Sequence, residues 1–305
     1  MKTTVLKKRI KGYIDLIRPF TLLAPIIVSV CIMFASFFYN GTTGDLFAIW
    51  WKTIIPASFA LAILNAASNA LNQFTDIKTD KISKPYRPII RGDVSPNEAK
   101  TMSLILYITA FSLSMLINVM FSIFVLLIIV FTVTYSIPPR IKDMLYINQL
   151  WVGVPRGLLA ILASWSVFGN ALQTLPLAIG VIAMCFLIGG SITKDIIDGE
   201  ADRKTGTRTL INTYGVKKAA LISLPFMFFP FAFVPILTDF GILDSHFILL
   251  TLLAIPSCLV FYLMIRDEKK AKHLENTSSW TMMYITYFLF AFVFSFLTII
   301  GSITA

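Results

Sequence analysis

Charged side chains are scarce in this sequence. They make up 14% of the 305 residues, whereas hydrophobic residues make up 57%. A soluble globular domain carries about 25% charged residues. The composition therefore excludes a soluble globular enzyme, a disordered chain and a nucleic-acid-binding domain in water, and it predicts an integral membrane protein.

Residues that commonly form disulfides or bind soft metals are also few. The three cysteines lie far apart in apolar runs, and the two histidines lie at the edges of such runs. They provide neither a disulfide framework nor a zinc-type ligand spacing. The sequence also has no glycine-rich P-loop, which argues against a nucleotide ligand.

Long apolar runs dominate the chain. A helix needs about 20 mostly apolar residues to cross a bilayer. We count nine such runs; eight is the alternative, because only a short polar step at Asn118 separates two of them. The runs begin near Phe20, Thr53, Met102, Phe121, Tyr146, Leu172, Ala219, His246 and Trp280. We therefore expect an all-α, polytopic bundle of nine transmembrane helices.

Basic residues alternate between the segments that connect these runs. The N-terminal segment and the connections after the second, fourth, sixth and eighth runs carry nearly all of them, and the other connections carry only Lys52. By the positive-inside rule, the N-terminus is expected in the cytoplasm and the C-terminus outside. The net charge of +10 then reflects topology and requires no nucleic-acid partner.

The N-terminal segment, residues 1–18, is expected to form a basic amphipathic stretch on the inner membrane surface. Its apolar side comprises Ile10, Tyr13, Ile14 and Ile17.

Two polar groups with helical spacing end the second and sixth runs. The first is Asn65, Asn69, Asn72, Asp76 and Asp80; the second is Asp195, Asp198 and Asp202. Steps of three and four residues keep side chains on one helix stripe. Both groups end even-numbered runs, so both are expected at the cytoplasmic side of the membrane.

The simplest interpretation of these groups is a pair of solvated helix ends with salt-bridged carboxylates. Two observations favour a metal site instead. Amides inside an apolar run are costly without partners, and carboxylates on one stripe repel each other unless a cation compensates them. Oxygen ligands suit a hard divalent cation such as Mg²⁺.

A basic run follows each acidic group. The two runs are Lys84, Arg87 and Arg91, and Arg203, Lys204 and Arg208. Carboxylates, a metal and arginines together indicate a polyanion, most simply a diphosphate. Because the diphosphate lies at the mouth of an apolar bundle, we expect an isoprenoid diphosphate. The spacing of the groups also predicts a repeat of spans one to four and five to eight, plus a ninth span.

At these positions the chain resembles the UbiA superfamily of intramembrane prenyltransferases. The family motif N-D-x-x-D-x-x-x-D corresponds to residues 72–80 (NQFTDIKTD), followed by residues 84–92 (KPYRPIIRG). The second family motif resembles residues 194–210 (KDIIDGEADRKTGTRTL), and residues 18–19 (RP) and 135–142 (YSIPPRIK) are also family-like. Gln73 departs from the usual Asp, and the missing charge argues against it as a metal ligand.

The resemblance implies a single domain over residues 1–305 that transfers a prenyl group from its diphosphate to an acceptor with Mg²⁺ as cofactor. It implies that Mg²⁺, and through it the diphosphate, is held by Asn72, Asp76, Asp80, Asp195, Asp198 and Asp202. It implies that the departing diphosphate is neutralised by Arg87, Lys142, Lys194 and Arg208. The candidate catalytic residues are Asp76, Asp198, Lys142 and Tyr135.

Ionisation of the allylic C–O bond leaves a cation that must be shielded from water. Aromatic faces can stabilise it, and Tyr135, Phe74 and Tyr146 are candidates. The sequence identifies no general base, although Asp198 can serve as one instead of binding the metal. Arg156 is a charge well inside a predicted span, so it is a functional candidate. It can bind an acidic group of the acceptor or the diphosphate, or it can instead reach outward to the interface or pair with a buried carbonyl.

The acceptor remains open between an aromatic quinone precursor and geranylgeranylglyceryl phosphate, as in archaeal ether-lipid synthesis. Gln73 and the Arg156-Gly157 pair slightly favour the aromatic acceptor. A terpene cyclase and a lipid transporter or binding protein are the other classes, although polar residues at the membrane edge argue against transport. We expect a plasma-membrane protein in contact with lipid, with its active site facing the cytoplasm; the sequence indicates no oligomeric state.

Overall fold

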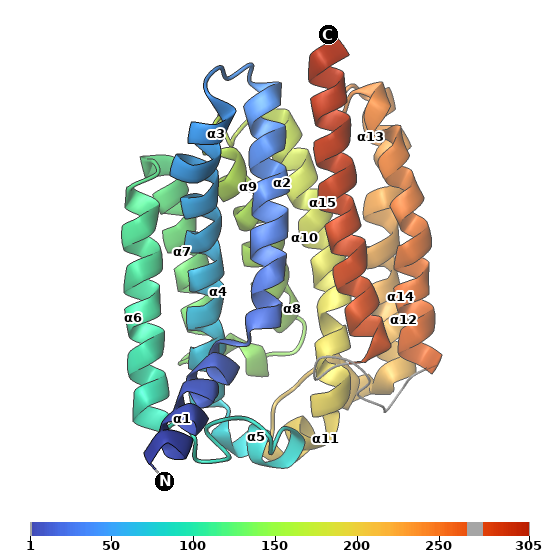
Figure 1. Cartoon of the computed structure of the whole chain (residues 1–305). Coiled ribbons are helices and arrows are strands. Elements are labelled where there is room, and N and C mark those ends of the chain that lie inside the picture. Colours follow the sequence, from blue (N-terminus) through green and yellow to red (C-terminus); the bar gives the residue numbers. More distant parts are fainter. Residues whose placement is uncertain (1, 267–276, 305) are drawn as a thin grey trace.

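The computed structural model describes residues 2–266 and 277–304, and this part of the chain is all-helical, without any β-strand. Most helices run side by side along one direction in a single bundle (Figure 1). The helices of the bundle are α2 (Leu23–Tyr39), α3 (Leu46–Ile49) with the π-helix η2 (Trp50–Ile54) and α4 (Ile55–Thr75), α6 (Pro96–Met115), α7 (Val119–Ser136), α8 (Ile147–Gly153) with the π-helix η4 (Val154–Leu159) and α9 (Ala160–Trp165), α10 (Thr174–Gly190), α12 (Leu210–Ala232) with α13 (Val234–Asp239), the 3-10 helix η6 (Ser245–Leu253) with α14 (Ala254–Arg266), and α15 (Ser278–Thr304).

Seven helical stretches in the described residues are long and apolar enough to cross a membrane. They are Leu6–Tyr39, Leu46–Thr75, Val119–Ser136, Thr174–Thr205, Leu210–Asp239, Ser245–Arg266 and Ser278–Thr304. The expected count of nine is not confirmed by length and hydropathy. The other two expected runs form α6 and the α8–η4–α9 segment, where Glu98, Lys100 and Arg156 lower the mean hydropathy.

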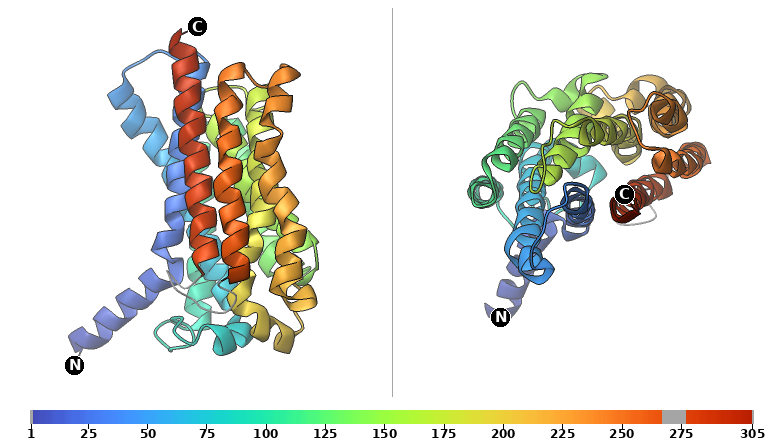
Figure 2. Two further views of the ribbon diagram at one scale, coloured as in Figure 1. Left: turned by 90° about the vertical axis from the view of Figure 1, so that its right-hand side faces the viewer. Right: turned by 90° about the horizontal axis from the view of Figure 1, so that it is seen from above.

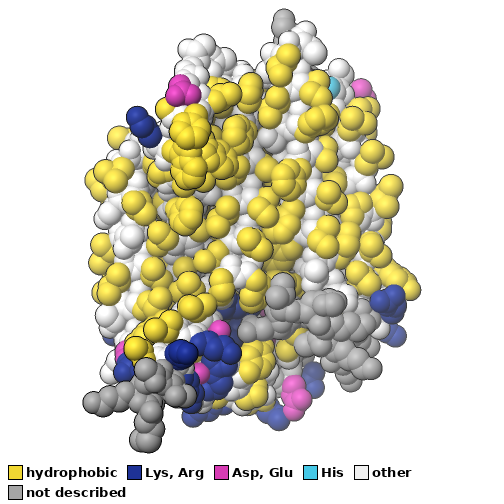
Figure 3. All heavy atoms as spheres, viewed as in Figure 1, with side chains coloured by type: hydrophobic (Ala, Val, Ile, Leu, Met, Phe, Trp, Pro, Cys, Tyr) yellow, Lys and Arg dark blue, Asp and Glu magenta, His cyan; other side chains and the backbone are white. Residues whose placement is uncertain are grey.

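The two described ends of the chain lie at opposite ends of the bundle. Helix α1 (Lys2–Ile17) leaves the lower end at an angle, whereas α15 ends at the upper end (Figures 1 and 2). On the face shown in Figure 3, Lys and Arg side chains gather near the lower end. The bundle is therefore polarised in charge along its long axis.

Both long helices that carry the acidic groups change direction at this lower end. Helix α4 ends at Thr75, and the short α5 (Ile77–Ser83) follows after a break at Asp76. The stripe expected from residue 65 to 80 is therefore not one continuous helix. Helix α10 continues through a 3-10 turn, η5 (Ser191–Lys194), into α11 (Asp195–Thr205). Helices α5 and α11 contact each other, which brings the two acidic groups together.

Helix α10 and the η4 segment approach each other closely at Gly157. A Cβ atom built on Gly157 lies 2.5 Å from both the Cα and the N of Met184, which are main-chain atoms. A Cβ atom on Gly180 of the same helix pair lies 2.7 Å from Cδ1 of Leu158, the end of a flexible side chain. Both glycines lie at the same interface. The side chain next to Gly180 can move aside, whereas the main chain next to Gly157 cannot.

We expect Gly157→Ala to destabilise the folded protein by about 1–3 kcal/mol, because the added methyl group forces main-chain atoms apart. Gly180→Ala is the matched control and should cost clearly less, since the Leu158 side chain can rotate away. The measurement is thermal unfolding of both variants in the same detergent. Equal losses in Tm would contradict the close main-chain approach at Gly157.

Candidate active site

A cavity at the lower end of the bundle collects both acidic groups. Its volume is about 1290 Å³, including the opening to solvent. Its lining contains all six expected metal ligands: Asn72, Asp76, Asp80, Asp195, Asp198 and Asp202. It also contains other expected site residues: Tyr135, Arg87, Lys142, Lys194 and Arg156. Residues from both motifs, more than 100 positions apart in the chain, therefore line one space.

Four carboxylates of the two motifs, those of Asp76, Asp80, Asp195 and Asp198, form ion pairs with cations. Arg87 donates to Oδ2 of Asp80 at 2.6 Å, and both side chains are nearly inaccessible to solvent. Lys194 pairs with Asp195, the first residue of α11. Lys84, which directly follows α5, pairs with Asp198 of α11. This last ion pair joins the first motif to the second.

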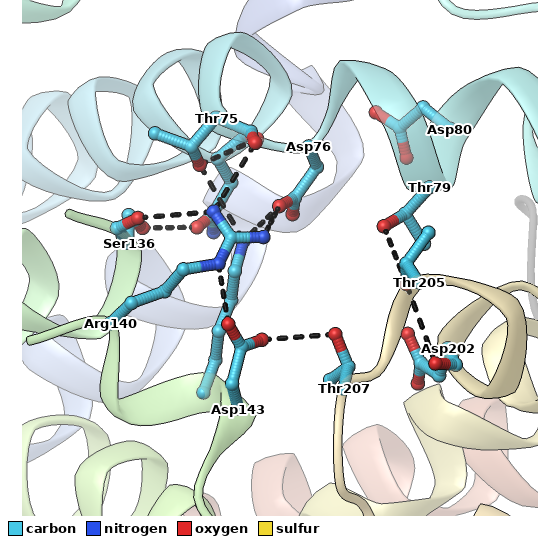
Figure 4. Close-up of polar contacts among 12 residues, drawn as sticks. Thr75, Asp76, Thr79, Asp80, Ser136, Arg140, Asp143, Asp202, Thr205 and Thr207 are labelled. Carbon is cyan, nitrogen blue, oxygen red and sulfur yellow. Dashed lines mark hydrogen bonds and ion pairs between the residues drawn. The ribbon is translucent and has the colours of Figure 1, made fainter. Parts of the chain in front are cut away.

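Asp76 is held by the loop after α7. Lys142 forms an ion pair with Asp76, and Arg140 donates to Asp76 Oδ1 at 3.1 Å. Arg140 also donates to Oδ2 of Asp143 at 2.6 Å, and Asp143 in turn accepts from Thr207 Oγ1 at 3.0 Å (Figure 4). The loop thus connects the first motif with the segment that follows α11.

The sequence analysis did not assign Arg140 to the site. It belongs to the family-like segment 135–142, which is the one signal that singles it out. Its partner Asp143 lies outside the two acidic groups, so no helical spacing indicates it.

Two of the expected catalytic residues lie deep in this charged layer. The Lys142 side chain is buried against Asp76, and burial lowers the pKa of Lys142 from its ordinary value while the Asp76 carboxylate opposes this. Tyr135 lines the cavity, and Nζ of Lys194 lies 5.9 Å from the centre of its ring. Both side chains therefore face the space between the two motifs.

The residues of the cavity fit Mg²⁺, although they do not form a ready-made cage. Within the described residues, no three Asp, Glu, His or Cys side chains converge closely enough to hold one ion. Asp76, Asp80, Asp195 and Asp198 pair with cations, as the simpler sequence interpretation proposed for these groups. Even so, the donors are hard oxygens, and the buried Oδ2 of Asp195 has no hydrogen-bond partner in the described structure. Mg²⁺ typically takes one or two carboxylates and completes its shell with waters and phosphate oxygens.

Three amides of α4, those of Asn65, Asn69 and Gln73, bind main-chain carbonyls. Asn69 Nδ2 donates to the Ile17 carbonyl at 2.9 Å, and Gln73 Nε2 donates to the Leu16 carbonyl at 2.7 Å. Asn65 Nδ2 likewise donates to the Thr21 carbonyl at 3.2 Å. These bonds satisfy carbonyls at the end of α1 and in the turn after it. Gln73 thus provides an N–H donor, which the carboxylate of an Asp lacks.

Some expected site residues lie elsewhere. The Arg208 side chain is exposed and does not line the cavity, although its backbone N–H donates to the Asp143 carbonyl at 3.3 Å. Phe74 packs against a hydrophobic cluster that contains Leu71, and Tyr146 is 52% exposed. Neither aromatic residue lines this cavity.

A second, mostly apolar cavity shares part of its lining with the charged one, and we call it the chamber; its volume is about 920 Å³, including its opening to solvent. Its walls include Val28, Leu61, Leu64, Ile128, Ala160 and Leu187. The residues that border both spaces include Arg156, Trp280 and Tyr284. The sequence analysis did not assign the aromatic residues of α15 to the site, because they belong to an ordinary apolar run and reach the chamber only through packing.

An all-helical membrane protein with a charged cavity at one end of the bundle, next to an apolar chamber, is typical of intramembrane enzymes that act on lipid-like ionic substrates. The family model of the UbiA prenyltransferase family matches residues 28–285 of this chain. The chain therefore belongs to the UbiA prenyltransferase family, and it is a prenyltransferase.

Named relatives and solved structures agree with this assignment. The chain is 26% identical to digeranylgeranylglyceryl phosphate synthase of Methanobrevibacter smithii, over 92% of this chain and 96% of that protein. It is 31% identical to the enzyme of the same name from Methanococcoides burtonii, over 74% of this chain and 80% of that protein. A structure of a UbiA homologue from Archaeoglobus fulgidus bound to GPP and Mg²⁺ has the same fold, with a TM-score of 0.67. The two chains are 19% identical, over 94% of this chain and 99% of that one.

We expect Gln73→Glu to lower the stability of the protein by about 1–3 kcal/mol, because the variant keeps the shape of the side chain but loses the donor to the Leu16 carbonyl. Thermal unfolding in detergent measures this loss. The Mg²⁺ concentration for half-maximal activity should stay unchanged. Asp76→Asn is the comparison variant, and it should raise this Mg²⁺ concentration because it removes a charge that faces the cavity. A shift in the Mg²⁺ requirement of Gln73→Glu would return this residue to the ligand set.

Proposed function

We propose that this enzyme transfers a geranylgeranyl group from its diphosphate to geranylgeranylglyceryl phosphate, a reaction of archaeal ether-lipid synthesis. One observation carries the proposal: a cavity lined by both carboxylates and cations lies next to an apolar chamber and shares part of its lining with it. A prenyl diphosphate has the same division into an ionic head and an apolar tail. The name shared by the relatives, digeranylgeranylglyceryl phosphate synthase, supports the choice of acceptor.

We propose Mg²⁺ as the cofactor, held by the acidic groups: Asn72, Asp76, Asp80, Asp195, Asp198 and Asp202. When bound, Mg²⁺ supplies positive charge that stabilises the diphosphate as leaving group. The GPP and Mg²⁺ found with the Archaeoglobus homologue support this assignment. The cations that now face these carboxylates are then available to the phosphate oxygens.

Four of these cations are proposed to bind the diphosphate: Lys84, Arg87, Lys142 and Lys194. Each lines the cavity. Fixed positive charges in a site that excludes water stabilise a developing anion without the cost of reorganising solvent. Arg208, which is exposed here, can join them only if its side chain turns inward.

The chamber walls protect the allylic cation. Most residues that line the chamber are apolar or aromatic, and such walls shield an ionised prenyl group at the boundary with the charged cavity from water. Tyr135 and Tyr284 present rings at this level, and aromatic faces attract cations. Asp198 remains the proposed alternative base, since it lies at the cavity surface.

Arg156 is proposed to bind the anionic group of the acceptor. It borders both the charged cavity and the chamber. Its guanidinium makes no hydrogen bond or ion pair with any described residue, whereas Lys84, Arg87, Arg140, Lys142 and Lys194 all face carboxylates. A second anion can therefore bind Arg156 without displacing an existing ion pair.

The structure weakens the sequence argument for an aromatic acceptor. That argument rested in part on Gln73, which instead binds the Leu16 carbonyl. The remaining feature, Arg156-Gly157, fits a phosphate as well as a carboxylate, because a guanidinium recognises both.

We propose that α6 and the α8–η4–α9 segment also cross the membrane, giving nine spans with the N-terminus in the cytoplasm and the C-terminus outside. Both segments run alongside the other helices of the bundle (Figure 1). The corresponding α4–α5 and α10–η5–α11 breaks support a repeat of spans one to four and five to eight within one domain. The active site then faces the cytoplasm, and we propose the plasma membrane as its location.

Helix α1 is proposed to rest on the inner membrane surface. Its Leu16 is buried, and Lys8 and Arg9 form ion pairs with Asp93 and Glu98. The side chains of Leu6, Ile10 and Ile14 are about half exposed along one stripe. An apolar stripe next to basic residues suits the lipid headgroup region.

Single cysteines in a variant without the three native cysteines test this topology. A membrane-impermeant maleimide should label Thr42→Cys, Leu116→Cys and Leu172→Cys in intact cells. It should label Lys7→Cys and Met144→Cys only in inverted vesicles, because the charged end faces the cytoplasm. Labelling of Leu116→Cys from the inside would mean that α6 does not cross the membrane.

The reaction is tested with purified protein, Mg²⁺ and geranylgeranyl diphosphate, read by mass spectrometry of the lipid extract. We expect an adduct with geranylgeranylglyceryl phosphate and none with hydroxybenzoate, homogentisate or dihydroxynaphthoate. An adduct with an aromatic acid alone would overturn the proposed acceptor. A new hydrocarbon without any acceptor would indicate a terpene cyclase.

The same assay tests the role of the acidic groups. Asp76→Asn and Asp198→Asn should each lose at least about 100-fold in rate, since the loss of a charge at the diphosphate removes transition-state stabilisation. Excess EDTA should stop the wild-type reaction. Full activity of both variants, or full activity in EDTA, would contradict the metal–diphosphate mechanism, provided that both variants unfold at the wild-type temperature.

A further inference from the structure

Arg156 lies on an unusual stretch of main chain. The η4 segment (Val154–Leu159) is a π-helix between the α-helices α8 and α9. Single π-helical turns inside α-helices are uncommon and frequently occur at functional sites. The wider turn changes the direction in which Arg156 leaves the backbone relative to a regular helix, so the conformation of η4 decides where the guanidinium lies.

Neighbouring helices hold η4 at two adjacent residues. At Gly157, the main chain of α10 lies so close that no side chain fits. At Arg156, the hydroxyl of Tyr287 from α15 donates a hydrogen bond to the backbone carbonyl at 2.8 Å. Tyr287 is 131 residues away in the sequence, so this contact exists only because α15 packs beside η4.

Tyr287 is itself well fixed. Its side chain is 4% exposed, and its ring is stacked on the ring of Phe290, with 6.4 Å between ring centres and an angle of 12° between ring planes. Phe290 is fully buried in the main hydrophobic core. Tyr287 also lines the apolar chamber together with Arg156. The hydroxyl therefore presents a rigid donor to the main chain at the residue that carries the cation.

We infer that Tyr287 is a positioning residue for acceptor binding: its hydroxyl holds the Arg156 main chain so that the guanidinium meets the acceptor's anionic group at the boundary of the two cavities. The inference rests on the proposed function, in which Arg156 binds that group. Tyr287 does not need to touch the phosphate, and its effect on the reaction passes through Arg156 alone.

The kinetic test compares Tyr287→Phe, which removes only the hydroxyl, with Arg156→Leu and with the double variant. Tyr287→Phe should raise the KM for geranylgeranylglyceryl phosphate about 3- to 10-fold, the value of one hydrogen bond. The KM for geranylgeranyl diphosphate should not change. The double variant should be no worse than Arg156→Leu, because residues that act through one contact are not additive.

Tyr107→Phe is the matched control. Tyr107 is also a buried tyrosine, and its hydroxyl donates to Thr132 Oγ1 at 3.1 Å on another pair of helices. If loss of any buried tyrosine hydroxyl loosens the enzyme, both variants will raise the KM for the acceptor. A selective effect of Tyr287→Phe excludes that explanation, and additive effects of Tyr287→Phe and Arg156→Leu would overturn the inference.

A second measurement separates this inference from the identity of the acceptor. In the variant without native cysteines, Arg156→Cys is treated with a small water-soluble thiol reagent, and the labelling rate is measured with no substrate present. Adding Tyr287→Phe should slow labelling several-fold, whereas adding Tyr107→Phe should not. An unchanged rate would refute the positioning role even if the proposed reaction is correct. A slower rate with no effect of Arg156→Leu on acceptor KM would keep the positioning role and refute the proposed acceptor contact.

Discussion

Compensation of buried charge determines the structure of the charged end of the bundle. A charged side chain taken out of water costs several kcal/mol unless a partner of opposite sign accompanies it. Asp80 and Arg87 show this most clearly, since only 3% and 7% of their side chains remain exposed. The Lys84–Asp198 pair extends the same principle across the two motifs. The Lys84–Asp198 pair thus helps to hold the α5 segment against α11, because separating the two would leave each buried charge without this partner.

The same balance explains why the site contains both signs of charge. In the proposed reaction, a magnesium-bound diphosphate brings positive and negative charge together. The carboxylates can turn to the metal while the cations turn to the phosphate oxygens, so every buried charge keeps a partner. A site of carboxylates alone, or of arginines alone, would leave uncompensated charge either before or after the magnesium-bound diphosphate binds. The arrangement around Asp76, with Lys142 and Arg140 on one side, is suited to such an exchange.

The sequence predicted the all-helical membrane fold, because hydropathy is a local property. Helical spacing and the family resemblance together indicated most of the motif residues that line the cavity, with Arg208 as an exception. The sequence did not predict the break at Asp76 or the role of Gln73, which depend on how α1 packs against α4. Arg140 and the aromatic residues of α15 reach the site through contacts with distant segments, so spacing within one helix gives no sign of them. The count of nine spans remains a prediction, because Glu98, Lys100 and Arg156 weaken the hydropathy of two helices.

Arg156 differs from the other cations of the cavity in a way that bears on the acceptor. Five cations form ion pairs with carboxylates, whereas the Arg156 guanidinium forms none among the described residues; the five are Lys84, Arg87, Arg140, Lys142 and Lys194. Arg156 also lies where the charged cavity meets the chamber. A neutral acceptor would leave this cation without a counter-ion beside the prenyl chain, and an unpaired charge in an apolar setting is costly. An acceptor with its own phosphate removes that cost. Charge balance at Arg156 therefore favours an anionic acceptor, and the apolar chamber beside it favours one that also carries a lipid chain.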